Sequence, residues 1–221
     1  MKKGTADQTM LKRILMSVFG VCLCGMSVGF FKLAAFGVDP FQSLMAGLNK
    51  VFPISFGTLY MIANAALLIF ALVFDRHYVG FATFVNIFLL GYVVQFTYWV
   101  LRKMIPDPNM AVRGGFLLLG IVSISFSCAV YITADLGVSN YDAVALIISN
   151  TWKKGRFKYN RILTDLFCVL LGAGLFLLAG GKPKDIPAII GVGTIITAFF
   201  MGPLIDFFSE HVARPFLNGR S

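Results

Sequence analysis

The sequence predicts an all-α polytopic membrane protein with six transmembrane helices. We expect two inverted three-helix repeats, each with a short broken or re-entrant helix after its first span. Of the 221 residues, 58% are hydrophobic and 13% are charged, whereas a soluble globular chain carries roughly 25% charged residues. Long apolar runs recur along the chain, and a glycine-centred break occurs twice, at Gly37 and at Gly137.

The first membrane repeat is expected over residues 14–101, after a cytoplasmic tail of residues 1–13. Its first span, residues 15–36, is long enough to cross a hydrocarbon core of roughly 30 Å. The next segment, residues 39–52, offers only about 20 Å of helix, so we expect it to be re-entrant or interfacial. The two remaining spans of this repeat are expected at residues 57–74 and 79–101.

Each break is expected to end one helix and to begin the next. Gly37 and Gly137 can adopt the positive φ that terminates a helix. Asp39 and Ser139 can accept hydrogen bonds from the free N–H groups of the following helix. Pro40 suits the first turn of that helix, where a missing N–H has no consequence.

The second membrane repeat is expected over residues 114–208, after an inter-repeat loop of residues 102–113. A cytoplasmic tail of residues 209–221 follows it. The second short helix is expected at residues 139–152. The spans of this repeat are expected at residues 115–136, 162–179 and 186–208.

Matched residues in the two halves indicate an internal duplication. In order along the chain, the matches are Gly20 with Gly120, Gly37 with Gly137, Gln42 with Asp142, Asn64 with Asp165, Gly80 and Thr83 with Gly191 and Thr194, and Gly91 and Gln95 with Gly202 and Asp206. Because the matches keep their order and fall in corresponding helices, chance explains them poorly. An odd number of spans per repeat then requires the second copy to enter from the opposite side.

The distribution of basic residues agrees with opposite orientations and with cytoplasmic N- and C-termini. The loop after the first short helix carries Lys50. The loop after the second short helix carries Lys153, Lys154, Arg156, Lys158 and Arg161. Basic residues concentrate on the cytoplasmic side of membrane proteins, so the second of these loops is expected to be cytoplasmic.

Eight polar residues are candidates for binding a substrate: Asp39, Gln42, Asn64, Asn86, Ser139, Asn140, Asp142 and Asp165. Inverted repeats with interrupted helices place transport sites near the membrane midplane, because freed backbone groups must face protein or a water-filled cavity. At the breaks, helix N-termini can bind a polar or anionic group, and the carboxylates can tune charge or carry a proton. Capping alone also explains Asp39 and Ser139, but it does not require Asp142.

Two of these candidates have a structural alternative. Asp165 lies four residues after Arg161, so it can form an ion pair at the inner interface instead of a functional intramembrane site. Asn64 can hydrogen-bond a neighbouring helix, which is the commoner use of an intramembrane amide. Both alternatives stay open at this point.

Several other classes of function are disfavoured. The net charge of +9 would suit nucleic acid, but the bases flank apolar runs, so we expect contact with membrane lipid and none with nucleic acid. No metal site is expected, because Cys22 and Cys24 have no second Cys/His pair at ligand spacing. We expect no enzyme activity and no cofactor, because the sequence contains no nucleophile–base set and no nucleotide-binding segment.

The glycine and proline pattern resembles the YczE/YyaS/YitT group of bacterial integral membrane proteins. The resemblance covers about residues 14–208 and lies in the Gly37-x-x-Pro40-Phe41 break, the later Gly80-x-x-Thr83, and residues 202–206, Gly-Pro-Leu-Ile-Asp. It implies a multi-pass protein of the bacterial inner membrane. Asn140 stands where the pattern leads us to expect proline, which indicates unequal roles for the two breaks.

We therefore expect a small secondary transporter or permeation protein for a small polar or organic solute. Its site would lie at the two helix breaks, and Asp142 or Asp165 could couple transport to protons. The alternative is a non-transporting membrane factor that binds lipid or a partner protein through the basic cytoplasmic loop. The identity of the solute and the oligomeric state, including a homo-oligomer, are left open.

Overall fold

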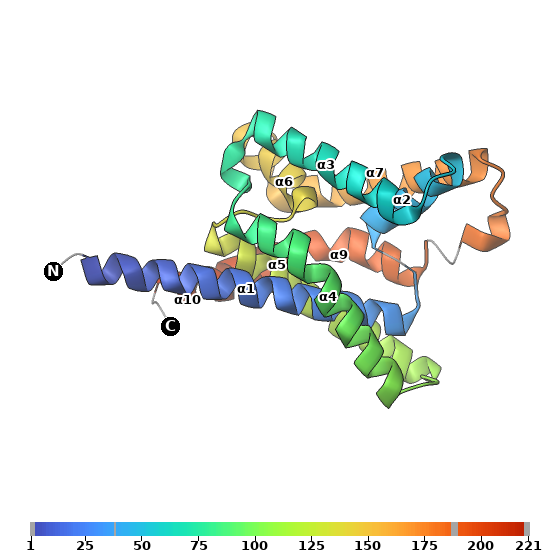
Figure 1. Ribbon diagram of the computed structural model, residues 1–221, viewed down its shortest axis with the longest axis horizontal. Coiled ribbons are helices and arrows are strands. Elements are labelled where there is room, and N and C mark those ends of the chain that lie inside the picture. Colours follow the sequence, from blue (N-terminus) through green and yellow to red (C-terminus); the bar gives the residue numbers. More distant parts are fainter. Residues whose placement is uncertain (1–2, 38, 187–189, 219–221) are drawn as a thin grey trace.

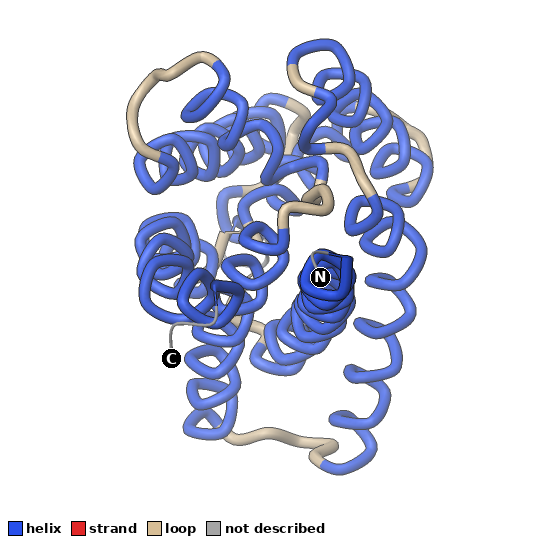
Figure 2. The backbone as a smooth tube through the Cα atoms, turned by 90° about the vertical axis from the view of Figure 1, so that its left-hand side faces the viewer, coloured by secondary structure: helices blue, strands red, loops and turns tan. Residues whose placement is uncertain are grey.

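The computed structural model describes residues 3–37, 39–186 and 190–218, and the regular secondary structure in these ranges is entirely helical. Figures 1 and 2 show two layers of helices. One layer contains α1 (Lys3–Ala34), α4 (Phe81–Met104), α5 (Met110–Ala134) and α9 (Val192–Phe208). The other contains α2 (Pro40–Val51), α3 (Phe56–Phe74), α6 (Asn140–Leu146) and α7 (Phe157–Leu178).

Short helical turns connect or extend these elements. Two 3₁₀ turns, Arg76–Tyr78 and Pro183–Asp185, follow α3 and α7. A π-helical turn, Ile147–Thr151, follows α6, so the second short helix expected at residues 139–152 is two consecutive pieces. A second π-helical turn, Ser209–Ala213, joins α9 to α10 (Arg214–Asn218).

Among the residues that the structure describes, five helices are long and apolar enough to cross a membrane: Met10–Ala34, Phe81–Met104, Met110–Ala134, Phe157–Leu178 and Val192–Asn218. The prediction of an all-α membrane protein is therefore confirmed. The remaining expected span, residues 57–74, corresponds to α3, a shorter apolar helix of 19 residues, or about 28 Å. Large apolar side chains such as Phe88, Leu170 and Leu178 remain exposed on the outer faces, as lipid contact requires.

Both terminal helices extend beyond their expected limits. The helix α1 begins at Lys3, because neither proline nor a positive φ interrupts the chain before Ala35, so most of the expected tail of residues 1–13 is helical. At the other end, helical structure continues past α9 to Asn218, so most of the expected tail of residues 209–221 is also helical. The last span was expected from residue 186, but residues 187–189 lie outside the described residues and α9 begins at Val192.

The glycines of the two breaks have the positive φ that the sequence predicts, but the preceding helices already end two residues earlier, at Ala35 and Asp135, which also have positive φ. Gly37 has a φ of 107° and Gly137 a φ of 96°, both in the region that favours glycine. The Asp39 carboxylate accepts a hydrogen bond from the Gln42 N–H at 3.1 Å and so caps α2. The Ser139 hydroxyl accepts from the Asp142 N–H at 3.1 Å and so caps α6. The predicted caps are confirmed.

Each break is held by the opposite half of the chain. The Gly193 N–H donates to the Phe36 carbonyl at 2.9 Å, and the Ala82 N–H donates to the Leu136 carbonyl at 2.8 Å. These two hydrogen bonds are equivalent under the residue matches of the two repeats. The Thr83 hydroxyl also donates to the Val138 carbonyl at 2.7 Å. The repeated Gly-x-x-Thr stretches are thus docking points for the breaks.

The short helices are exchanged between the halves in the same way, since α2 packs along α7 and α6 packs along α3. A side chain at Gly47 would overlap the carbonyl group of Gly172, so α2 and α7 approach at the distance of backbone contact. The equivalent positions of the other half, Ala71 and Ile147, are fully buried. Neither half therefore completes its own packing.

Candidate functional site

A cavity of about 670 Å³ lies where both breaks meet the long helices. Its lining includes side chains from α1, α3, α4, α5, α7 and α9 as well as from the two breaks. Seven of the eight residues selected from the sequence line it: Asp39, Gln42, Asn64, Asn86, Ser139, Asn140 and Asp142. The eighth, Asp165, is fully buried and contacts the lining residue Arg161. The structure therefore brings all eight residues into one region.

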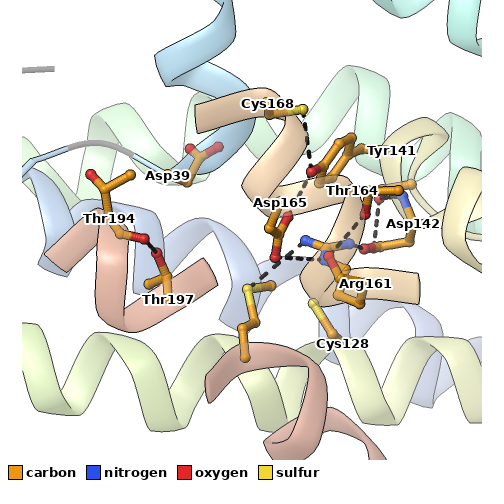
Figure 3. A network of polar contacts seen from close by, with 12 residues as sticks. Asp39, Cys128, Tyr141, Asp142, Arg161, Thr164, Asp165, Cys168, Thr194 and Thr197 are labelled. Carbon is orange, nitrogen blue, oxygen red and sulfur yellow. Dashed lines mark hydrogen bonds and ion pairs between the residues drawn. The ribbon is translucent and has the colours of Figure 1, made fainter. Parts of the chain in front are cut away.

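Arg161 joins two carboxylates at the edge of this cavity (Figure 3). Its guanidinium group bonds the Asp142 carboxylate through Nη1 and lies 3.3 Å from Asp165 Oδ2 through Nε. Arg161 is 4% exposed, Asp142 2% and Asp165 0%. Ionised groups are kept at such depth only when paired, so we treat these three residues as one unit, the Arg161 cluster.

Neutral donors complete the Arg161 cluster. The Tyr131 hydroxyl donates to Asp142, and the Ser139 hydroxyl donates to Asp142 Oδ2 at 2.6 Å. The Tyr141 hydroxyl donates to Asp165 Oδ1 at 2.6 Å, and its ring centre lies 4.5 Å from the Arg161 guanidinium carbon. These donors help to stabilise the two carboxylates, because a single guanidinium balances only one of their two negative charges.

The equivalent positions in the first half are neutral. Gln42 matches Asp142, Tyr60 matches Arg161, and Asn64 matches Asp165 when the two repeats are aligned. The Gln42 amide donates to the Asp39 carboxylate, and the Asn64 amide donates to the Tyr60 carbonyl at 2.9 Å. The charged cluster is therefore confined to the second half, although both halves contribute to the cavity.

The two halves also differ in how tightly their later helices pack. The helix α7 packs along α9, and Gly202 of α9 lies against the Lys158 carbonyl and the Arg161 side chain. In the described part of the chain α3 and α4 have no comparable contact, and Figure 1 shows them diverging. Asn64 of α3 and Asn86 of α4 line the cavity between them.

Asn140 links the second break to α3 of the first half. Its amide nitrogen donates to the Asn64 carbonyl at 3.2 Å. Its side chain is 5% exposed. An adjoining cavity of about 370 Å³ is lined by Lys32, Gly37, Asp39 and Gln42 among others, so it extends the first cavity along α1.

Three residues of the site were not selected from the sequence. Arg161 was assigned to the basic loop, and this was wrong: α9 covers it, because Gly202 permits a close approach at that position. The ion pair with Asp165 that was left open is present, and both residues are buried inside the protein. Tyr131 and Tyr141 gave no signal of their own, although Tyr141 matches Phe41 of the first break.

Within the described ranges, no group of three or more His, Cys, Asp or Glu side chains is placed to hold a metal ion. Cys24 and Cys128 line the cavity as free thiols. The polar chemistry of the site is thus that of carboxylates, one paired guanidinium, amides and hydroxyls.

Comparison with known proteins gives a family but no activity. A family model described as "Family of unknown function (DUF6198)" matches residues 11–210. An uncharacterized protein of Haemophilus influenzae is 26% identical over 92% of this chain and 86% of its own length. In Bacillus subtilis, the uncharacterized protein YyaS is 24% identical (90% of this chain, 93% of its own), and the uncharacterized membrane protein YczE is 26% identical (78% and 74%). No solved structure matches. The resemblance to the YczE/YyaS group is confirmed.

Proposed function

The chain belongs to the family of unknown function DUF6198, and from its cavity we propose that it is a small secondary transporter or permeation protein for a small polar or organic solute. The observation that carries this proposal is the shared cavity. Both helix breaks open into it, and they bring polar side chains from opposite halves of a membrane protein to one place. Broken helices with polar lining are how transporter folds build binding sites.

The proposed architecture is an inverted repeat in the bacterial inner membrane, with both termini cytoplasmic. The equivalent hydrogen bonds at Phe36 and Leu136 support the repeat, because each carbonyl accepts from the same place in the other half. Three membrane crossings per repeat require α3 to count as a crossing, and local thinning of the bilayer can accommodate a short helix. The termini follow from the surplus of basic residues in the expected cytoplasmic segments.

Coupling to protons forms a further part of this proposal. Protonation of Asp142 would remove one of the two charges that hold Arg161, and the Tyr131 and Ser139 hydroxyls could then rearrange. Such a change next to the cavity would alter its polarity. Intramembrane carboxylates in a polar network are a recurring means of proton coupling.

Access of water to the two breaks is the direct test. In a variant that lacks the four native cysteines, Gln42→Cys and Asn140→Cys would each be exposed to a membrane-impermeant thiol reagent from either side. We expect both positions to react from one aqueous side. Ser27→Cys is a buried control on α1 that should not react, and Asp107→Cys is an exposed control that should. Failure of both cavity positions to react from either side would contradict transport.

The alternative, a membrane factor that binds lipid or a partner protein, has one observation in its favour. Lys153, Lys154 and Arg156 are exposed in the loop after the second break. Clusters of exposed bases attract anionic lipid headgroups. Two results together would favour this alternative. The protein would bind vesicles that contain anionic lipid and lose this binding when the three bases are replaced, and neither break would react with the thiol reagent.

A further inference from the structure

We infer that the cavity recognises a primary ammonium group on a small organic solute, and that Asp39 and Asn140 hold this group. The inference rests on the proposed function, because it names the chemistry of the solute at the same site. Three independent features of the described residues lead to it: an unbalanced carboxylate, an acceptor without a donor, and a wall of aromatic rings.

The first feature is the distribution of charge around the cavity. Arg161 is already paired with two carboxylates, Asp142 and Asp165, so it offers no net positive charge to an anionic solute. Asp39 also lines the cavity, and within the described ranges no cation lies within ion-pair distance of it. Hydrogen bonds from Gln42 and the N-terminus of α2 stabilise this carboxylate, but they supply no full positive charge. A cation would complete the site.

The second feature is an acceptor without a donor. Asn140 must present its amide nitrogen to the Asn64 carbonyl, because only that nitrogen can donate. Its Oδ1 atom then has no hydrogen-bond partner in the described structure, although the side chain is 95% buried and lines the cavity. A buried acceptor left unpaired is unfavourable, and an N–H group of a bound solute would satisfy it.

The third feature is the aromatic wall of the cavity. The Phe41 ring lies 5.6 Å from Tyr60 and 5.1 Å from Tyr141, measured between ring centres, and all three side chains line the cavity. Aromatic faces attract cations and also bury the hydrocarbon part of an organic solute. Tyr141 already contacts the Arg161 guanidinium in this way, so one ring of the wall lies against a cation in the structure.

Lys32 can distinguish whether the ammonium group belongs to a simple amine or to an amino acid. It lines the adjoining cavity together with Asp39, and its side chain is exposed. A carboxylate on the same solute would meet Lys32, whereas a plain amine would not use it. The shared chemistry is therefore the ammonium group, and the solute is either an amine or an amino acid.

The test uses the purified full-length protein and isothermal titration with four probes: benzylammonium, benzyl alcohol, benzyltrimethylammonium and phenylalanine. We expect benzylammonium to bind at least about tenfold more tightly than benzyl alcohol, as the loss of one charge-assisted hydrogen bond implies. Benzyltrimethylammonium has no N–H group, so it should bind more weakly than benzylammonium and be insensitive to Asn140→Ala.

Matched variants distinguish the contributions of Asp39 and Lys32 to binding. Asp39→Asn keeps a good helix cap and removes the charge, so benzylammonium binding should weaken about tenfold while the fold is retained. Asp107→Asn, in an exposed loop, should change nothing. If Lys32→Gln weakens phenylalanine selectively, the ammonium group belongs to an amino acid. If phenylalanine binds no better than benzylammonium and Lys32→Gln does not weaken it, the ammonium group belongs to an amine.

Equal binding of benzyl alcohol and benzylammonium, or unchanged binding by Asp39→Asn, would overturn the inference. So would the absence of binding by both cations to a folded protein whose breaks react with thiol reagents, and that result would leave the proposed permeation function intact. If neither break reacts with the thiol reagents, both the proposed permeation function and the ammonium site would be contradicted.

Discussion

Two helix pairs occupy equivalent places in the two halves of this chain, α3 with α4 and α7 with α9, and they differ in how they meet. The second pair is closed over Arg161, whereas the first pair diverges around the cavity. Gly91 and Gly202 are matched residues on α4 and α9. A side chain added at Gly91 would meet nothing within 4 Å, but at Gly202 it would lie 2.8 Å from the Lys158 carbonyl oxygen.

The difference in closure coincides with a difference in charge. The closed side contains the Arg161 cluster, and the open side has the neutral residues Gln42, Tyr60 and Asn64 in the matched places. In the transporter that we propose, one closed half and one open half would represent one end state of alternating access. The comparison therefore suggests that the charged cluster fixes which half is closed, and each prediction below tests part of it.

The largest effect is expected from Arg161→Met, which leaves Asp142 and Asp165 buried without a cation. The free energy of unfolding in detergent should fall by about 3–5 kcal/mol, the usual cost of breaking a buried ion pair. The matched change in the open half, Tyr60→Phe, should cost about 1 kcal/mol, because it removes one hydroxyl. Denaturation monitored by circular dichroism would measure both, and similar losses would contradict the asymmetry.

A smaller effect is expected from the matched glycines. Gly202→Ala forces α9 away from α7 and should destabilise the protein by about 1–3 kcal/mol. Gly91→Ala faces open space and replaces a poor helix former, so it should be neutral or stabilising by about 0.5–1 kcal/mol. Thermal unfolding of the two variants side by side distinguishes them. A loss at Gly91 as large as that at Gly202 would mean that α4 does not face a cavity.

Substitutions at the two helix caps should differ less in their effect on the free energy of unfolding. Ser139→Ala removes the cap of α6 and a hydrogen bond to Asp142, and should cost about 1–2 kcal/mol. Asp39→Asn retains a capping oxygen at α2 and should change the stability by less than about 0.5 kcal/mol. The same unfolding measurement applies, and a larger loss for Asp39→Asn would show that its charge stabilises the empty protein.

The smallest effect is expected in the exposed basic loop. Replacing Lys153, Lys154 and Arg156 by glutamine should leave the free energy of unfolding within about 0.5 kcal/mol, since exposed charges contribute little. Reactivity of Gln42→Cys should also be unchanged. A large change in either quantity would mean that this loop controls the closure of the second half.

Much of the site could be predicted because the relevant signals are local. Glycine at a positive φ, followed by a capping side chain, identified both breaks at Gly37 and Gly137, and the duplication paired Gln42 with Asp142. Polar residues in apolar runs are costly unless they meet in a common place, which is why seven of them line one cavity.

Arg161 could not be placed in the same way. In the sequence it ends a run of bases, and its burial depends on the close approach of α9 at Gly202 and on the contacts of Tyr141 and Asp142 from α6. The early start of α1 and the helical turns that follow α9 were missed for a related reason: helix propagates beyond an apolar run until something ends it, and no proline does so near Lys3 or between Phe208 and Arg214. Burial and helix extent depend here on partners that are distant in the sequence.

The exchanged contacts of the breaks have a consequence for biosynthesis. Phe36 follows the first helix and is synthesised early. The donor to its carbonyl, the Gly193 N–H, lies near the other end of the chain and is synthesised late. During insertion the first break must therefore be accommodated by water, lipid headgroups or the insertion machinery until the final helix arrives. A ribosome-bound chain truncated before Gly191 would expose this break, and such intermediates are natural clients for chaperones and proteases of the membrane.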